Sequence, residues 1–343
     1  MLKYCLRRLS YMVLTLLAVS VVTFVVIQLP PGDVLSNRIA ELEAVGEATN
    51  IERIKGLRKT YGLDDPFHVQ YVRWMGLKWF VTLEKKDRGL LQGNLGRSFV
   101  NEKPVTELMA ERVPLTMFLF IVSVTLVYAV AIPIGIYSAT HKYRFWDYVG
   151  MAMTFIGMSV PGFLLALVLL FVLFHWYGIS PGGMFSPEFV GAPWSMARVV
   201  DFLKHLIAPL LVVTINGTAG LIRVMRANLL DQLRQLYVTA ARAKGLPEWK
   251  LLLKYPVRVA IIPVVSSIGF LLPGLIGGQA IMEIVLGLPT FGPLLLDALK
   301  MQDMYLAGSV VLVQTALVVV GVFLSDILLV VVDPRIRLTG GTK

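Results

Sequence analysis

The chain has 343 residues, of which 56% are hydrophobic and only 16% are charged, and its mean hydropathy is +0.72. These values exclude an ordinary water-soluble domain, because a soluble fold of this size has too little interior to bury so much apolar surface. The net charge of +10 is therefore interpreted as that of a membrane protein.

Runs of about 18 or more apolar residues are long enough to cross a hydrocarbon core about 30 Å thick. The first run follows Lys3, Arg7 and Arg8 as in a signal peptide, but it is long and lacks a small-x-small cleavage pattern, which predicts a retained anchor. We expect an all-α integral membrane protein with six transmembrane helices, near residues 9–29, 115–139, 149–175, 206–222, 260–286 and 307–332.

The basic residues are distributed unevenly between the predicted connections. Residues 1–8, 140–148, 223–258 and 333–343 hold half of the 32 Lys and Arg residues but only four of the 22 Asp and Glu residues. The positive-inside rule therefore predicts that these segments, and both termini, are cytoplasmic. Because the excess positive charge lies along a face next to anionic lipid, the isoelectric point near 9.7 indicates the bilayer as a partner and no nucleic acid.

The connection from residue 30 to residue 114 is long and its charges are balanced. Helix-like apolar spacing covers residues 36–61, and a second amphipathic run covers residues 69–80 after a break at residues 62–66. We expect a helical extracytoplasmic element between the first and second spans. It is compatible with a lid over a pore, a dock for an external partner, or a plain helical cap.

Residues 237–258 form a basic segment between two apolar runs and are too polar for a bilayer interior. Ala240, Ala241 and Gly245 have Ala-Ala-x-x-x-Gly spacing, in which small residues permit a tight turn and Gly245 can adopt a positive φ. A short amphipathic helix follows. The segment is interpreted as a cytoplasmic docking surface; the alternative is an amphipathic helix lying on the inner leaflet.

Three polar residues fall inside predicted spans. Gln279 and Glu283 are four residues apart and so share a helical face, and Asn216 lies in the fourth span. Intramembrane carboxylates are unfavourable and usually face protein or water. We therefore assign all three to a translocation path or its gate, with interhelical hydrogen bonding as the alternative. For Asp326, in the last span, a structural role is favoured.

No motif in the chain indicates catalysis or a resident cofactor. Cys5 is the single cysteine, and the four histidines lack metal-ligand spacing. The sequence also lacks a Gly-x-x-x-x-Gly-Lys-Ser/Thr phosphate loop and a Gly-x-Ser-x-Gly nucleophile motif. We expect no metal, no catalytic residue and no cofactor in this chain.

Six stretches in this order resemble the permease subunit of a binding-protein-dependent ABC importer of the dipeptide and oligopeptide group, and they cover most of the chain. They are LPPGD at 29–33, YGLDDP at 61–66, GNLGRSF at 93–99, ERVPLT at 111–116, YVTAARAKGL at 237–246 and DPRIR at 333–337. Two departures stand out: Thr239 replaces a glutamate of the general loop pattern, and PTFG at 289–292 replaces Pro-Gly-Leu-Gly near the predicted gate.

The resemblance implies that Ala240, Ala241 and Gly245 set a bend and that residues 246–254, from Leu246 on, form a coupling helix seated in a groove of a cytoplasmic ATPase. The contacts are expected at its polar and apolar side chains, namely Glu248, Trp249 and Leu252. The implied partners are two ATPase subunits that carry ATP and Mg, a second, non-identical permease and an extracytoplasmic solute-binding protein. The implied location is a bacterial or archaeal cytoplasmic (inner) membrane.

The expected organisation is an N-terminal segment with the first span (1–29), the extracytoplasmic element (30–114), an importer transmembrane domain (115–333) with coupling loop 237–258, and a cytoplasmic tail (334–343). The expected substrates are di- and oligopeptides, with oligosaccharides, opines or nickel chelates as alternatives. A secondary transporter is less favoured, because only two clear intramembrane acids and no inverted repeat are seen.

Overall fold

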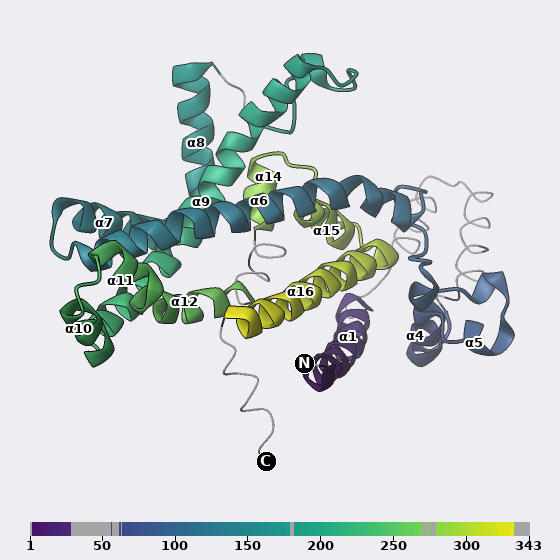
Figure 1. Ribbon diagram of the computed structural model, residues 1–343. Coiled ribbons are helices and arrows are strands. Elements are labelled where there is room, and N and C mark those ends of the chain that lie inside the picture. Colours follow the sequence, from purple (N-terminus) through teal and green to yellow (C-terminus); the bar gives the residue numbers. More distant parts are fainter. Residues whose placement is uncertain are drawn as a thin grey trace. The chain divides into compact units, whose positions relative to one another are not determined.

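The computed structural model describes residues 2–28, 56, 62, 64–178, 182–269, 274 and 279–332 (Figure 1). Within these residues every regular element is helical, and the only β-type pairing is an isolated bridge between Arg97 and Pro104. The all-α fold class is therefore confirmed. The predicted helical spacing at residues 36–61 and the tail at 334–343 fall outside the described residues, apart from Gly56.

Among the described residues, four helices are each long and apolar enough to cross a membrane. They are α1 (Leu2–Gln28), α6 (Val105–Thr140), α9 (Met196–Leu233) and α16 (Met304–Val332). Each contains most or all of one predicted apolar run. A helix suits this role because it satisfies its backbone hydrogen bonds internally, which hydrocarbon cannot do for it.

The third predicted run is not one continuous helix. It consists of α7 (Phe145–Ser159) and α8 (Gly162–Tyr177), which are bent by 109° at their junction. The break follows from Pro161, which lacks a backbone N–H and disfavours the helical conformation at Val160 before it. Val160 is accordingly extended, with φ −92° and ψ 119°.

The fifth predicted run begins with α12 (Pro256–Ser266) and ends with α14 (Ala280–Val285), followed by α15 (Phe291–Lys300). Residues 270–273 and 275–278 between them lie outside the described part of the chain. The long helices and the bent pair account for four or five spans. Six spans with both termini cytoplasmic therefore stay a prediction.

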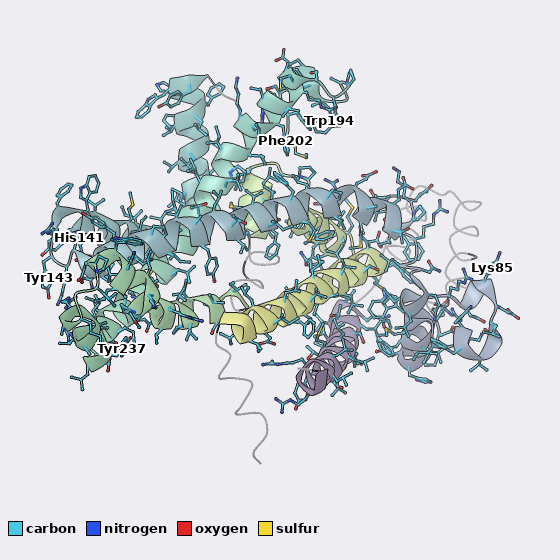
Figure 2. All side chains as sticks on the ribbon, viewed as in Figure 1. Lys85, His141, Tyr143, Trp194, Phe202 and Tyr237 are labelled. Atoms are coloured by element: carbon cyan, nitrogen blue, oxygen red, sulfur yellow. The ribbon has the colours of Figure 1, made fainter. Side chains whose placement is uncertain are left out.

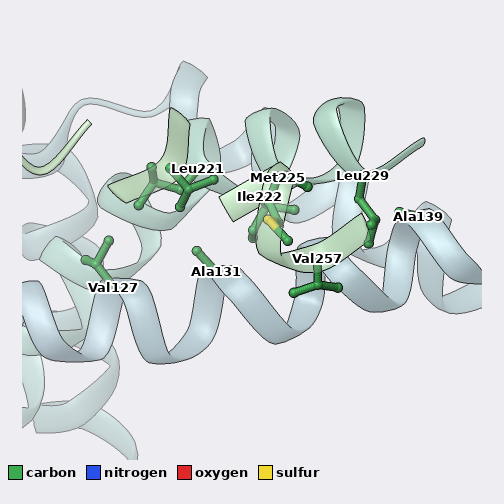
Figure 3. Close-up of a cluster of buried hydrophobic side chains, with 10 residues drawn as sticks. Val127, Ala131, Ala139, Leu221, Ile222, Met225, Leu229 and Val257 are labelled. Carbon is green, nitrogen blue, oxygen red and sulfur yellow. The ribbon is translucent and has the colours of Figure 1, made fainter. Parts of the chain in front are cut away.

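The chain divides into two compact units, one made of residues 1–8, 115–292 and 318–343 and the other of residues 9–114 and 293–317. In the first unit, α6, α9 and α12 share a core of closely packed side chains (Figure 3). Glycines let these helices approach: a Cβ at Gly135 would lie 2.7 Å from the Cβ of Met225. The buried members are Val127, Ala131, Ala139, Leu221, Ile222, Met225, Leu229, Val257, Ala260 and Val264.

The second unit contains α4 (Phe67–Met75), α5 (Trp79–Thr82) and two 3₁₀ turns, η1 (Lys85–Asp87) and η2 (Leu90–Gln92). The amphipathic run predicted at residues 69–80 is thus divided between two helices. The division lies at Gly76, whose φ of 77° ends α4 in a left-handed conformation.

The GNLGRSF stretch at residues 93–99 packs against the start of α16 in the same unit. The hydroxyl of Ser98 donates to Asp303 Oδ2 at 2.5 Å, and the Leu306 N–H donates to Asp303 Oδ1 at 3.3 Å. Ser98 and Asp303 are both fully buried. Asp303 therefore caps α16 and ties the 93–99 stretch to it.

Candidate functional site

The predicted coupling segment folds as two short helices after α9. They are α10 (Leu236–Ala243) and α11 (Glu248–Lys254), joined by a turn at residues 244–247 (Figure 1). Gly245 in that turn has a φ of +74°, as the sequence predicts, and a residue with a Cβ is strained there. The predicted start of the second helix at Leu246 is two residues too early, because Pro247 occupies its N-cap position.

Side chains from both helices pack together in a small hydrophobic cluster next to the turn. Val238 and Ala241 of α10 pack with Leu251 of α11, and Leu246 and Tyr255 cover the edge of this cluster. Ala241 is buried, whereas Ala240 beside it is exposed. The two alanines therefore differ in role: a larger side chain at 241 would separate the helices, whereas position 240 faces outward.

An ion pair connects the two ends of the turn. The guanidinium of Arg242 donates to Glu248 from Nη2 to Oε1 at 2.5 Å and from Nε to Oε2 at 3.2 Å. This pairing holds the pKa of Glu248 below its ordinary value. Glu248 is thus engaged within the segment, and its carboxylate links α11 to α10 across the turn.

One side of α11 presents large apolar side chains to the exterior. Trp249 is 63% exposed and Leu253 is 58% exposed. They are four residues apart and so lie on one helical face. Leu252, expected to make partner contacts, is half-buried. The sequence interpretation did not include Leu253 among the contact residues, although its spacing of four residues from Trp249 indicates a shared helical face.

The segment is also anchored to the end of α9. The Tyr237 hydroxyl donates to Gln232 Oε1 at 2.7 Å, and Tyr237 is labelled in Figure 2. Further back on α9, the Arg226 guanidinium donates from Nε and Nη2, each at 2.9 Å, to the two carboxylate oxygens of Asp147 in α7. Asp147 Oδ2 also accepts the Tyr143 N–H at 2.9 Å. Asp147 and Arg226 both belong to segments predicted to be cytoplasmic, but sequence gave no signal that they pair.

Gln279 and Glu283 line one cavity, as their spacing predicts. The Glu283 Oε2 accepts the Gly292 N–H at 3.2 Å, so the PTFG stretch forms part of the wall. Sequence reasoning missed the hydroxyl groups that share this cavity. The complete lining is Thr116, Leu119, Phe120, Ser123, Pro209, Val213, Gln279, Met282, Glu283, Leu288 and Thr290.

Asn216 is not part of that cavity lining. Its Nδ2 lies 3.0 Å from where a Cβ of Gly162 would stand, so it faces the start of α8. Asp326 pairs with Arg8 NH1 at 3.1 Å, which supports its structural interpretation. Among the residues that the structure describes, no group of three or more His, Cys, Asp or Glu side chains is arranged to hold a metal ion.

Residues 131–338 match the family described as binding-protein-dependent transport system inner membrane component, and residues 1–120 match its N-terminal companion family. Similar proteins include the oligopeptide transport system permease protein AppB of Bacillus subtilis, which is 34% identical over 97% of this chain and 99% of its own length.

A putative peptide permease of Brucella suis is also 34% identical, over 99% of this chain and 100% of its own length. The nickel import system permease protein NikB of Staphylococcus aureus is 28% identical, over 99% and 93%. The family matches span both the N-terminal region and the segment that contains α10 and α11. The chain therefore belongs to the family of inner membrane components of binding-protein-dependent transport systems.

Proposed function

We propose that this chain is the permease subunit of an ATP-driven importer for di- and oligopeptides, and that it forms half of the translocation path. The peptide assignment is supported by relatives whose names specify oligopeptide or peptide transport. The proposed assembly adds a second, non-identical permease, two cytoplasmic ATPase subunits that bind ATP and Mg, and an extracytoplasmic binding protein that delivers the solute. The proposed site is a bacterial or archaeal inner membrane.

The observation that carries the coupling role is the folded hairpin of α10 and α11. An amphipathic helix lying on lipid needs neither a left-handed glycine turn nor a bidentate ion pair to a preceding helix, and this segment has both. The exposed Trp249 and Leu253 form a compact apolar face. Aromatic and aliphatic side chains of this kind are suited to insertion into a groove of a partner protein.

Force applied at this face has a continuous route into the chain. It passes from the α10–α11 core to α9 through the Tyr237–Gln232 hydrogen bond, and from α9 to α7 through the Asp147–Arg226 pair. In the proposed cycle, ATP binding draws the ATPase subunits together. The helices then rearrange so that the cavity between them opens to the outside and no longer to the cytoplasm. Gln279 and Glu283 contact the solute as it passes.

A substitution at Gly245 tests the coupling role. Gly245→Asp introduces strain and a negative charge into the turn, whereas no atom within 4 Å obstructs a Cβ there. Gly191→Asp is the matched control, since Gly191 has a φ of +75° and equally open surroundings outside the coupling segment. Both variants therefore carry a similar backbone penalty.

The tagged chain is isolated in mild detergent, and ATPase recovery and peptide uptake are measured for each variant. We expect Gly245→Asp to lose the ATPase subunits and uptake while remaining inserted, and Gly191→Asp to retain both. Normal uptake by Gly245→Asp would contradict the coupling role.

Nickel chelates form the second candidate substrate class, because one relative is named as a nickel permease. Competition decides between the classes: unlabelled di- and tripeptides should suppress uptake of a labelled peptide by the assembled importer, and nickel chelates should not. Oligosaccharides and opines are tested in the same assay. Suppression by a nickel chelate alone would reverse the peptide assignment and leave the importer architecture unchanged.

A further inference from the structure

The short segment at residues 77–88, which follows α4, carries an apolar surface that the importer mechanism does not use. Phe80, Val81 and Leu83 are 60%, 85% and 69% exposed. All three come from α5 or the residue after it, so the apolar side chains are concentrated in a very short stretch. Scattered exposed apolar residues are normal, but a cluster of this kind marks a contact surface.

The depth of the neighbouring helix α4 indicates what this surface contacts. The Ser20 and Tyr71 hydroxyls are 2.7 Å apart, and Gln28 Nε2 donates to Gln70 Oε1 at 2.7 Å. Ser20 lies eight residues before the end of α1 at Gln28, which corresponds to about 12 Å at 1.5 Å per residue. Half of a hydrocarbon core is about 15 Å thick, so these contacts fall within the final half of a span that ends at Gln28.

Contacts with α16 also place α4 beside the first turns of a second helix of membrane-spanning length. The Trp74 ring lies 3.0 Å from where a Cβ of Gly308 would stand. Gly308 is four residues beyond the first residue of α16, Met304, which is about 6 Å along the helix. Phe24 of α1 also contacts Trp74, with ring centroids 5.4 Å apart. Two helices of membrane-spanning length, α1 and α16, therefore both pack against α4 near their ends.

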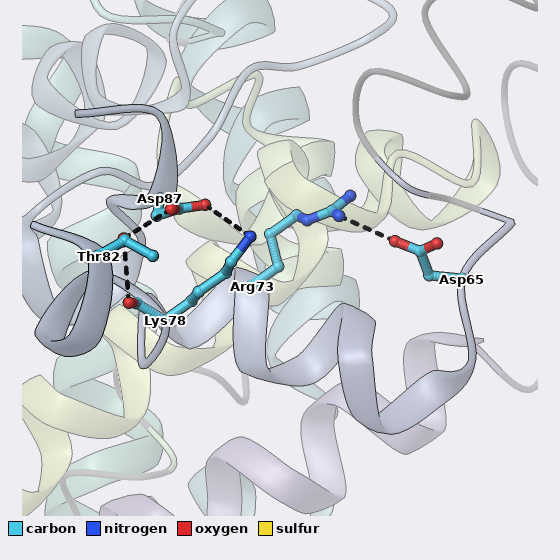
Figure 4. A network of polar contacts seen from close by, with 5 residues as sticks. All are labelled: Asp65, Arg73, Lys78, Thr82 and Asp87. Carbon is cyan, nitrogen blue, oxygen red and sulfur yellow. Dashed lines mark hydrogen bonds and ion pairs between the residues drawn. The ribbon is translucent and has the colours of Figure 1, made fainter. Parts of the chain in front are cut away.

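A network of polar contacts closes residues 77–88 on themselves, and just beyond them Gln92 Nε2 donates to the carbonyl of Gly76, the C-cap of α4, at 3.2 Å. The Thr82 hydroxyl donates to Asp87 Oδ2 at 2.6 Å and the Lys78 ammonium lies 3.5 Å from Asp87 Oδ1, as Figure 4 shows. Asp87 is buried, so the two ends of the segment are joined through its carboxylate. The apolar side chains of α5 are consequently presented in a defined position and not by a loose loop.

Exposed basic side chains outnumber exposed acidic ones in this segment, with Lys78, Lys85 and Arg88 against Glu84. Lys85 and Arg88 are exposed beside α5, and Lys85 is labelled in Figure 2. Basic side chains at a membrane surface attract anionic lipid, and aromatic residues such as Trp79 and Phe80 are enriched at that level. Apolar side chains flanked by basic ones are thus suited to the membrane–water interface, where the apolar groups contact acyl chains and the basic groups contact head groups.

We propose that residues 77–88 form a lipid anchor, in which Phe80, Val81 and Leu83 insert into the leaflet that holds the Gln28 end of α1 while Lys85 and Arg88 contact anionic head groups. The anchor holds the predicted extracytoplasmic element against the bilayer. A dock for the binding protein is the competing use of the same surface, and the two predict opposite surroundings for Val81.

Nitroxide labelling distinguishes them. Cys5 is the single cysteine, so Cys5→Ser gives a background in which Val81→Cys carries the only label in the chain. Val22→Cys, at a 59% exposed position within α1, is the lipid-facing control, and Glu188→Cys, at an exposed position in η3 (Pro187–Phe189), is the water-facing control. The full chain is reconstituted in nanodiscs of phosphatidylethanolamine and phosphatidylglycerol.

The measurement is the ratio of collision rates with oxygen, which partitions into lipid, and with a water-soluble nickel chelate. We expect the Val81 ratio to equal that of Val22 and to exceed that of Glu188 several-fold. A ratio equal to that of Glu188 overturns the proposal. So does a Val81 label that leaves water only when the binding protein is added to the assembled importer, because the surface is then a protein dock.

The head-group contact has its own test. Lys85→Glu combined with Arg88→Glu should shift the Val81 label toward water in nanodiscs containing phosphatidylglycerol. Lys103→Glu combined with Lys300→Glu is the control, because it makes the same change of charge at exposed positions outside the segment. An equal shift in both, or none in the first, would remove the electrostatic part of the anchor.

Discussion

The Asp147 carboxylate in α7 and the Arg226 guanidinium in α9 form a two-contact ion pair in which Asp147 is completely buried. The carboxylate also accepts the Tyr143 N–H, so one side chain joins the turn before α7 to the helix that leads into the coupling segment. Tyr143 and His141 of this turn are labelled in Figure 2. This pair is the polar link in the proposed route from α10 and α11 to the rest of the first unit.

Removing one partner of this pair should be strongly destabilising. Asp147→Asn leaves the partly exposed Arg226 without its carboxylate, and losing a hydrogen bond between charged groups costs about 1.5 to 3 kcal/mol. We expect a lower thermal transition of the detergent-solubilised chain, measured by size-exclusion chromatography after heating. Glu107→Gln, which breaks the exposed Lys103–Glu107 pair, should leave the transition unchanged. Partial rescue is expected for the exchange of Asp147→Arg with Arg226→Asp; equal transitions for Asp147→Asn and Glu107→Gln would contradict this account.

Substitutions of exposed and of buried residues in α11 should have different effects on folding and on ATPase binding. Trp249→Ala and Leu253→Ala remove side chains that face outward, so the hairpin should keep its hydrogen-exchange protection while the ATPase subunits are lost. Leu251→Ala removes a fully buried side chain and should destabilise the hairpin by about 2 to 3 kcal/mol. Trp176→Ala, at a 71% exposed position in α8, is the control for loss of an exposed tryptophan. Loss of protection in Trp249→Ala would argue against a docking face.

The clasp between Ser98 and Asp303 should make stability depend on pH. Burial raises the pKa of Asp303, and the hydrogen bond from Ser98 only partly opposes this. Because the pKa of Asp303 is higher in the folded than in the unfolded protein, its protonated carboxyl group stabilises the fold. That contribution is complete below the unfolded-state pKa of about 3.9 and is lost as the pH rises through the higher folded-state pKa. Thermal transitions should therefore fall over that range in the unmodified chain.

Substitution removes this dependence. Asp303→Asn has no titratable group at the clasp, so its transition should vary less with pH than that of the unmodified chain. Asp297→Asn, an exposed acid on α15 in the same unit, is the matched control and should leave the slope as it was. A slope unchanged by Asp303→Asn would show that other groups determine it.

Gly292 should control the position of the Glu283 carboxyl group. A Cβ at Gly292 would lie 2.2 Å from Glu283 Oε2 and 2.7 Å from Ala280 Cα, so Gly292→Ala must displace the carboxyl group or the backbone. A lost hydrogen bond is worth about 1 kcal/mol, so we expect peptide uptake to fall about fivefold. Gly220→Ala in α9, where nothing lies within 4 Å, is the control and should transport normally. Equal uptake by both variants would exclude Glu283 from the path.

Local sequence patterns were sufficient for much of this fold. Apolar run length predicted α1, α6, α9 and α16, because a span needs only a minimum number of apolar residues in succession. The Ala-Ala-x-x-x-Gly spacing predicted the turn at Gly245, since few residues other than glycine tolerate that φ. The i, i+4 spacing likewise brought Gln279 and Glu283 into one cavity.

Other features depend on contacts between residues far apart in the chain. The sequence counted Asp147 and Arg226 only as charges, placed Asn216 with Glu283, and read residues 149–175 as one helix. The break at Pro161 had a local cause that the run length concealed, whereas only packing decided that Asp147 meets Arg226 and that Asn216 faces Gly162. Periodicity reports which face of a helix is apolar, whereas the choice of neighbour is made by the close approach of whole helices, and no local pattern encodes that choice.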